Sequence, residues 1–120
     1  MDPEVHDETL RDGLQCPSVT DPPLHEKIAI LHALEAMGVD SVNVGLPGAG
    51  PRAFADALAL CQEIAMQRMR IRPGCAARTT GADIAPIVEL SQRAGIAVEE
   101  LAFIGSSPIR QLAETWPPDP

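Results

Sequence analysis

Short apolar runs alternate along the chain with longer segments in which apolar side chains recur every three or four residues. The short runs contain branched or small apolar residues, which favour extended strands. The strand candidates are Val5–Leu10, 39–45, 69–76 and 98–104. Pro73 lacks a backbone N–H and Gly74 lacks a side chain, so the third run is the weakest strand candidate.

The longer segments predict helices between these strands. The first helical stripe consists of Leu24, Ile28, Leu31 and Leu34. Gly38 is typical of a helix end, and Asp21 is expected to cap the start of this helix, with Pro22 in its first turn. Apolar spacing at helical period therefore predicts a helix that follows the first strand directly.

Three further helices are expected. Gly50-Pro51 opens the second, and Ser107-Pro108 opens the last, which the proline-rich end of the chain (117–120) cuts short. For the third, Asp83 is expected to be the N-cap, so that Pro86 falls in the first turn, where its missing N–H costs nothing.

The strands begin near residues 5, 39, 69 and 98, which gives spacings of 34, 30 and 29 residues. About thirty residues is the length of one strand, one crossover helix and two short loops. Four such units in a row predict a single α/β domain over residues 1–120 with a parallel sheet. Either an open doubly wound sheet or one half of an eight-stranded β/α barrel satisfies this pattern.

Composition narrows the class of protein. The 120 residues include 17 Asp and Glu against 9 Lys and Arg, a net charge of -8, which argues against nucleic acid and against a basic membrane anchor. Three cysteines without a C-x-x-C spacing argue against a disulfide scaffold or a zinc ribbon. No secretory leader or membrane-length apolar run is visible, so a cytoplasmic location is expected.

The residues that carry chemistry follow the first strand candidate, in the segment His6 to Gln15. In parallel α/β folds active sites lie at the carboxyl ends of the strands, and an adjacent Arg11 and Asp12 stand at that point. A carboxylate is an oxygen ligand for a divalent cation, and a guanidinium can stabilise a developing oxyanion. From spacing alone, a plain ion pair in a loop is the favoured interpretation of the two residues.

The pattern Asp7-x-Thr9-Leu10-Arg11-Asp12-Gly13-x-Gln15 resembles the first-strand signature of the superfamily of isopropylmalate synthase, homocitrate synthase and hydroxymethylglutaryl-CoA lyase. The likeness extends over about residues 4 to 113 and is best with the isopropylmalate synthase branch. Further segments that carry it are Gly45-Leu46-Pro47, Ala77-Arg78 and Ser106-Ser107-Pro108-Ile109. The resemblance implies the N-terminal half of a TIM-type (β/α)8 barrel, a partial pyruvate carboxyltransferase-type domain.

The resemblance also implies an activity, an acyltransferase of leucine biosynthesis that condenses acetyl-CoA with a 2-oxo acid. A divalent metal (Mg, Mn or Zn) would act as the Lewis acid. By position, Arg11 would stabilise the enolate or alkoxide oxygen and Asp12 would bind the metal, while Gln15 and Arg78 would hold the substrate. A lyase or a carboxyl transferase of the same superfamily is the alternative.

Three departures from the family pattern matter. Asn43 stands where the second strand often bears a Glu, so the substrate-binding position 43 offers an amide instead of an anion. Leu101 stands where the synthases commonly have a His. The resemblance implies that a His-x-His pair completes the metal shell in this family. The sequence contains no such pair, so the isolated chain is expected to be inactive.

A rival hypothesis is a non-catalytic half-barrel. Half a barrel leaves its first and last strands as open edges, which favour self-association or a protein partner. Of the remaining reactive side chains, His6 is expected to be a hydrogen-bonded core or rim residue and not a ligand, and Cys61 and Cys75 are expected in the core.

Overall fold

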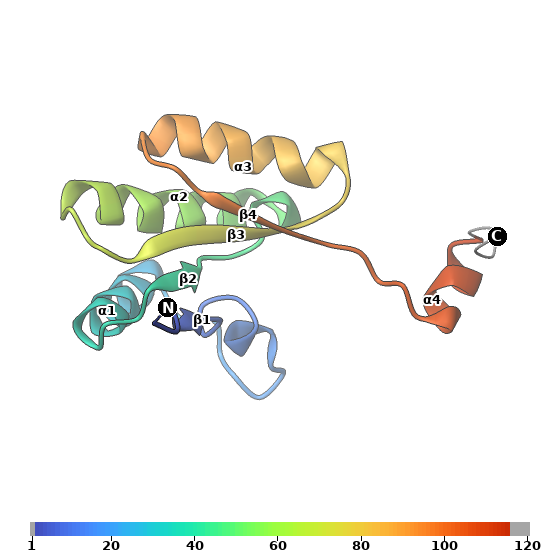
Figure 1. The fold of residues 1–120 in the computed structure, drawn as a ribbon, viewed down its shortest axis with the longest axis horizontal. Helices are drawn as coiled ribbons and strands as arrows, with labels where there is room; N and C mark the ends of the chain where they lie inside the picture. The colour runs from blue at the N-terminus through green and yellow to red at the C-terminus, as the bar shows by residue number, and fades with distance from the viewer. Residues whose placement is uncertain (1, 116–120) are drawn as a thin grey trace.

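The computed structural model describes residues 2–115, which form four strands and four α-helices in strict alternation (Figure 1). Two short 3-10 helices, η1 and η2, follow the first and second strands. The elements in chain order are β1 (His6–Asp7), η1 (Gly13–Gln15), α1 (Leu24–Ala36), β2 (Ser41–Asn43), η2 (Pro47–Ala49), α2 (Pro51–Met66), β3 (Arg72–Arg78), α3 (Gly81–Ala94), β4 (Glu99–Phe103) and α4 (Pro108–Ala113). Within the described residues, no helix is both long and apolar enough to cross a bilayer.

The four strands form one parallel sheet in the order β1-β2-β3-β4. His6 is in register with Ser41, Ser41 with Arg72, and Gly74 with Glu99. Consecutive strands are neighbours throughout, which is the order of a barrel wall and differs from the order of a doubly wound sheet, where the winding reverses. The predicted α/β fold with four parallel β/α units is confirmed.

The core lies between one face of the sheet and the helices α1, α2 and α3. Val42 and Cys75 point into it and are fully buried, as are Leu31 of α1, Leu60 of α2 and Leu90 of α3. Cys61 is also fully buried there, so the prediction of two core cysteines is confirmed. Because side chains alternate along a strand, Ser41, Asn43 and Gly74 face the other side of the sheet.

Two helix starts differ from prediction because an acidic side chain finds a partner other than the helix end. The helix α1 begins at Leu24 after Pro23, without a side-chain cap. Asp21 does not cap it but forms ion pairs with Lys27 (3.3 Å) and with Arg52 of α2 (2.8 Å).

The N-terminus of α3 is the second correction. The helix begins at Gly81 after Thr80, so Asp83 lies inside the first turn and not at the N-cap. Its carboxylate binds Arg78 instead. Pro86 consequently lies within the helix, beyond the first turn where it was predicted.

The strand β1 is shorter than the predicted run to Leu10. The Asp7 carboxylate accepts hydrogen bonds from the backbone N–H and the hydroxyl of Thr9, at 2.8 and 3.0 Å. These bonds turn the chain immediately after Asp7, as Asp side chains commonly do. The turn begins the loop that carries Arg11 and Asp12.

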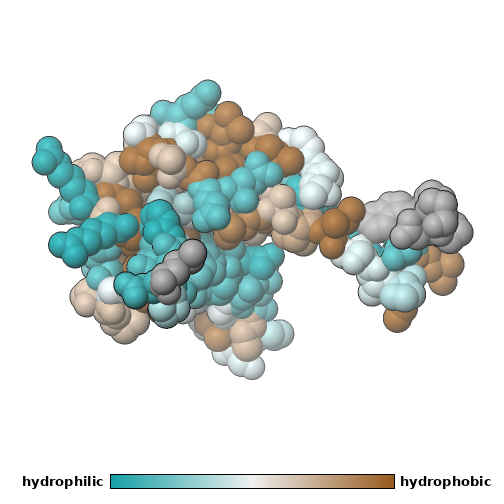
Figure 2. Space-filling view, viewed as in Figure 1, coloured by the Kyte–Doolittle hydropathy of each residue, from teal (hydrophilic) through white to brown (hydrophobic). Residues whose placement is uncertain are grey.

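The far end of the chain is the most exposed part of the fold. The side chains of β4 are exposed or half-buried, and an extended segment leads to α4, which projects away from the three-helix layer (Figure 1). Ile109 and Leu112 of α4 are more than 80% exposed (82% and 81%), and apolar surface is visible on α4 (Figure 2). The proline run 117–120, expected to end this helix, lies outside the described residues.

Candidate functional site

Arg11 and Asp12 lie in the loop that follows β1, at the carboxyl end of the sheet. The backbone N–H groups of Arg11 and Gly13 both donate to the carbonyl of Glu8 at 3.1 Å, which closes a tight turn. Arg11 Nη1 donates to Asp12 Oδ1 at 2.5 Å. The Asp12 side chain is 54% exposed and that of Arg11 is 19% exposed, so the guanidinium lies inward and the carboxylate outward.

The guanidinium of Arg11 reaches across the end of the sheet to β4. Its central carbon lies 5.5 Å from the centroid of the Phe103 ring, within the range of a cation–π contact. The Nε–H of Arg11 is buried and has no hydrogen-bond partner among residues 2–115. A buried donor without a partner is costly, so this N–H is a natural position for an acceptor oxygen from a ligand.

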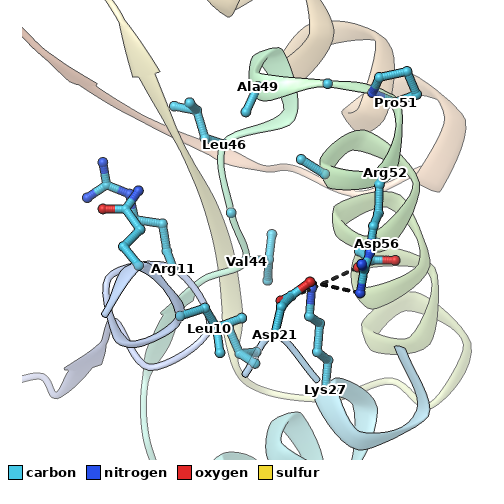
Figure 3. A pocket seen from close by; sticks show the side chains of 15 residues that line it. Leu10, Arg11, Asp21, Lys27, Val44, Leu46, Ala49, Pro51, Arg52 and Asp56 are labelled. Carbon is cyan, nitrogen blue, oxygen red and sulfur yellow. Dashed lines mark hydrogen bonds and ion pairs between the residues drawn. The ribbon is translucent and has the colours of Figure 1, made fainter. Parts of the chain in front are cut away.

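A cavity of about 410 Å³ adjoins this loop (Figure 3). Arg11 and Gln15 line it from the loop, with Leu46 after β2 and the first residues of α2 opposite. An ion-pair network forms one wall: Lys27 Nζ lies 2.8 Å from Asp56 and 3.3 Å from Asp21, and Arg52 pairs with Asp21. Two of the predicted site residues, Arg11 and Gln15, therefore share one cavity.

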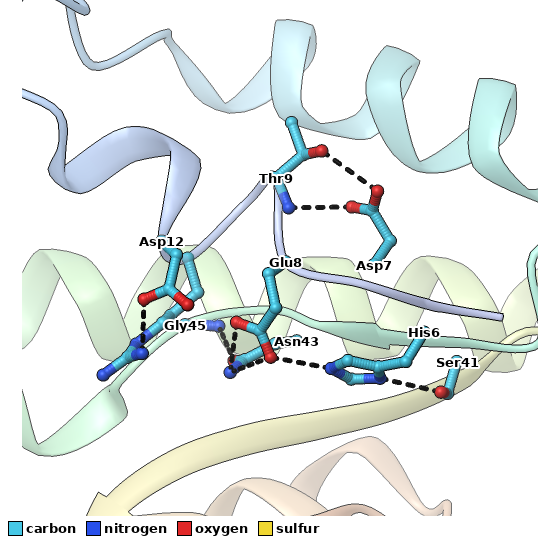
Figure 4. A network of polar contacts seen from close by, with 9 residues as sticks. His6, Asp7, Glu8, Thr9, Asp12, Ser41, Asn43 and Gly45 are labelled. Carbon is cyan, nitrogen blue, oxygen red and sulfur yellow. Dashed lines mark hydrogen bonds and ion pairs between the residues drawn. The ribbon is translucent and has the colours of Figure 1, made fainter.

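Asn43 belongs to a polar network at the ends of β1 and β2 (Figure 4). Its amide nitrogen donates to both carboxylate oxygens of Glu8, at 3.2 and 3.1 Å. Glu8 Oε1 also lies 2.7 Å from His6 Nε2, and His6 Nδ1 lies 2.8 Å from Ser41 Oγ. His6 is thus a hydrogen-bonded rim residue, as predicted. Sequence reasoning missed Glu8, although its position between Asp7 and Thr9 of the motif was a usable signal.

Arg78 lies at the end of β3 and binds Asp83. The Asp83 carboxylate accepts from the backbone N–H of Arg78 at 2.9 Å and from its Nε at 2.8 Å. These hydrogen bonds hold the pKa of Asp83 below its usual value, chiefly through the guanidinium. A Cβ on Gly48 would lie 2.9 Å from Asp83 Oδ1, so the close approach of η2 to α3 requires glycine there.

The predicted site residues therefore do not meet in one cavity. Arg78 lines a second cavity, of about 710 Å³, together with Phe103 and Arg110. Asp12 lines neither of these two cavities. The Phe103 ring, which faces both Arg11 and the second cavity, is the structural link between the two groups.

The fit of a divalent metal can be judged from the donor set. Asp12 offers one carboxylate, already paired with Arg11. Within residues 2–115 there is no cluster of three or more His, Cys, Asp or Glu side chains that could hold an ion. Protein metal sites generally require about three ligands or more, so the described residues do not form a complete metal shell by themselves.

The parallel order β1-β2-β3-β4, with Arg11 and Asp12 at the carboxyl end of β1, matches the wall of a β/α barrel, a fold whose active sites lie at that end. The model of the HMGL-like family matches residues 2–111, and the chain belongs to this family. It is 39% identical over 108 residues to a 2-isopropylmalate synthase of Methylobacterium nodulans, and 43% identical over 81 residues to that of Methylorubrum populi. A homocitrate synthase of Methanosarcina mazei is 33% identical over 89 residues.

These alignments cover most of this chain but little of each relative. The alignment with the Methylobacterium nodulans synthase includes 88% of this chain and 19% of the relative. The corresponding shares are 68% and 15% for the Methylorubrum populi synthase, and 74% and 21% for the homocitrate synthase. The chain corresponds to the N-terminal part of the family domain.

Proposed function

We propose that this chain supplies the first four β/α units of the active site of a 2-isopropylmalate synthase-like acyltransferase, which condenses acetyl-CoA with a 2-oxo acid. The observation that carries the proposal is Arg11, whose guanidinium is held over Phe103 at the carboxyl end of the sheet with its Nε–H unpartnered. The proposal includes leucine biosynthesis as the route and the cytoplasm as the place of action.

In this proposal each residue has a limited task. Arg11 offers fixed positive charge to the oxygen that becomes negative when a carbanion forms next to the thioester or adds to the ketone. Gln15 contacts the 2-oxo acid from the same cavity. Asp12 supplies one oxygen ligand, and the described residues do not complete the metal shell around it.

Arg78 and Asn43 have less direct tasks. Two of the Arg78 nitrogens are engaged by Asp83, so the guanidinium is held rigidly and offers its remaining N–H groups to a substrate carboxylate. Asn43 acts through Glu8, which it holds. A lyase or a carboxyl transferase would use the same groups, and the products of the reaction distinguish these alternatives.

The experiment is a hybrid barrel in which the aligned segment of this chain replaces the corresponding segment, 108 aligned residues, of the Methylobacterium nodulans synthase. Free CoA is measured with a thiol reagent in the presence of acetyl-CoA and either pyruvate or its branched homologues. CoA release that depends on the 2-oxo acid is the expected result, and the 120-residue chain alone is expected to release none. A correctly folded hybrid that releases no CoA with any 2-oxo acid would count against the proposal.

A second function, self-association of half-barrels, is favoured by the exposed apolar side chains at the open end of the sheet. Phe103 and Ile104 at the end of β4 are 44% and 59% exposed, and Ile109 and Leu112 of α4 are more exposed still. The sheet ends at β1 on one side and at β4 on the other. A two-fold axis would place β4 of each copy beside β1 of the other, in the parallel direction, and close a ring.

Light scattering after size exclusion is expected to give twice the mass of the chain. The substitution I104E should yield a monomer with unchanged circular dichroism, because this side chain follows β4 at the proposed seam and, at 59% exposure, its loss creates no cavity. V88E on α3 is the control for an added surface charge and should remain dimeric. Because each copy has a net charge of -8, added salt should strengthen the dimer. A monomer at all salt concentrations would exclude this second function.

A further inference from the structure

Three carboxylates, those of Asp7, Glu8 and Asp12, lie in the segment at the end of β1, and their partners differ. Asp7 accepts two hydrogen bonds from Thr9 and serves the turn. Asp12 is paired with the guanidinium of Arg11, which balances its charge. Glu8 has neither role: its hydrogen-bond partners are the amide of Asn43 and the imidazole of His6.

The amide of Asn43 is oriented by its own contacts. Its Oδ1 accepts from the backbone N–H of Gly45 at 3.1 Å, so its nitrogen is turned toward Glu8. Asn43 is 2% exposed, whereas the side chain of Glu8 is 36% exposed and open to solvent. At the ends of β1 and β2, a buried amide therefore holds a reachable carboxylate in a defined position (Figure 4).

Behind Glu8 lies a short chain of hydrogen bonds. Ser41 Oγ can donate to His6 Nδ1, which leaves the Nε2–H of His6 to donate to Glu8 Oε1. Glu8 Oε1 has two contacts and Oε2 has one, so Oε2 retains an acceptor position. The backbone carbonyl of the same residue accepts from the N–H of Arg11 at 3.1 Å, which places the two residues in one turn.

From these contacts we propose that Glu8 is the proton acceptor of the site, a role that rests on the function proposed above. In this step the C–H bond of the methyl group beside the thioester breaks and the proton forms an O–H bond with the Glu8 carboxylate. The electron pair of the C–H bond becomes the C=C bond of the enolate, and the π pair of the C=O bond moves to the thioester oxygen. Arg11, the cation of the same turn, would stabilise this negative oxygen. The carboxylate thus comes from β1, while position 43 of β2 supplies the amide that holds it.

The test uses the hybrid barrel with the same measurement of CoA release. E8Q keeps the shape of the side chain but cannot take up the proton, so kcat should fall about a hundredfold while KM stays within about threefold. The double variant E8Q/N43E returns a carboxylate to the neighbouring strand and reverses the polarity of the hydrogen bond between positions 8 and 43. The kcat of E8Q/N43E should be at least about tenfold higher than that of E8Q, a gain that a purely structural role for Glu8 would not produce. E26Q removes a carboxylate from the exposed face of α1 and should leave kcat unchanged.

Each contrary result has a separate meaning. An E8Q hybrid within about threefold of the unsubstituted hybrid would overturn the role of Glu8 and leave the proposed function standing. A rise in KM at constant kcat, or a failure of N43E to restore any activity, would also overturn it. If the unsubstituted hybrid released no CoA, both proposals would fall. Circular dichroism melting of each variant in the 120-residue chain confirms that lost activity is not lost fold.

Discussion

The D12N variant of the hybrid barrel is expected to release CoA at least about a hundredfold more slowly than the unsubstituted hybrid. Asn has the same shape as Asp but no charge, so the Arg11 guanidinium loses the anion 2.5 Å away and the site loses a carboxylate ligand. Removal of one group that stabilises developing charge in a transition state typically lowers kcat by about two to three powers of ten. Release of free CoA at saturating 2-oxo acid is the measurement.

R11K is the companion substitution. Lys keeps the positive charge but has neither the planar face that lies over Phe103 nor the buried Nε–H, so a loss of about tenfold or more is expected. E89Q on the exposed face of α3 is the matched control and should have no effect. Activity of D12N and R11K equal to that of the control would show that the pair is an ordinary surface ion pair.

The second large effect is a loss of stability at high pH that arises from Cys61 and Cys75. Both thiols are fully buried, and burial raises the pKa of Cys61 to about 12. The pKa of Cys75 is also raised, mainly by burial and further by Cys61. An unfolded chain has thiols of ordinary pKa, so the unfolded state releases protons first as the pH rises.

The free energy of unfolding therefore falls as the pH rises. Stability is fully present below the pKa of an unfolded thiol, about 9, and is lost above it until the folded pKa is reached. Each thiol should lower the free energy of unfolding by about 1.4 kcal/mol for each pH unit in that window. Urea denaturation between about pH 8 and pH 10.5 is the measurement.

The control for this effect is the pair of variants C61A and C75A. Each removes one buried thiol, so each should flatten the pH dependence relative to its own stability at pH 8, even if that stability is lower. The exposed Cys16 provides an internal contrast, since C16A should leave the slope unchanged. A wild-type slope no steeper than that of C61A would contradict the expected result.

The places where sequence reasoning failed have a common physical cause. Asp21 and Asp83 both stand near helix starts and were predicted as caps, but each has a cation within reach in the folded chain: Arg52 for Asp21 and Arg78 for Asp83. A charged partner competes with backbone N–H groups for the same oxygens. Such competition depends on distances between elements, which apolar spacing along one helix does not contain.

At the candidate site, neighbouring residues of the motif could be predicted from the sequence, whereas residues joined by tertiary contacts could not. The motif identified Arg11, Asp12 and Gln15 because they are close in sequence, and these residues do lie together at the carboxyl end of β1. Glu8 was overlooked because its importance comes from Asn43, thirty-five residues away, through the pairing of β1 with β2. Phe103 was overlooked for a similar reason, since its contact with Arg11 spans the whole sheet.

By itself, the sequence determined the alternation of strands and helices, the parallel sheet, the two core cysteines and the family. These properties follow from local periodicity and from a motif of neighbouring residues, both of which are independent of tertiary contacts. The tertiary structure alone decided which carboxylate is neutralised, which remains reachable, and that Arg78 is held by Asp83. Electrostatic partners are chosen by distance in space, and only folding brings residues from different strands within hydrogen-bonding reach.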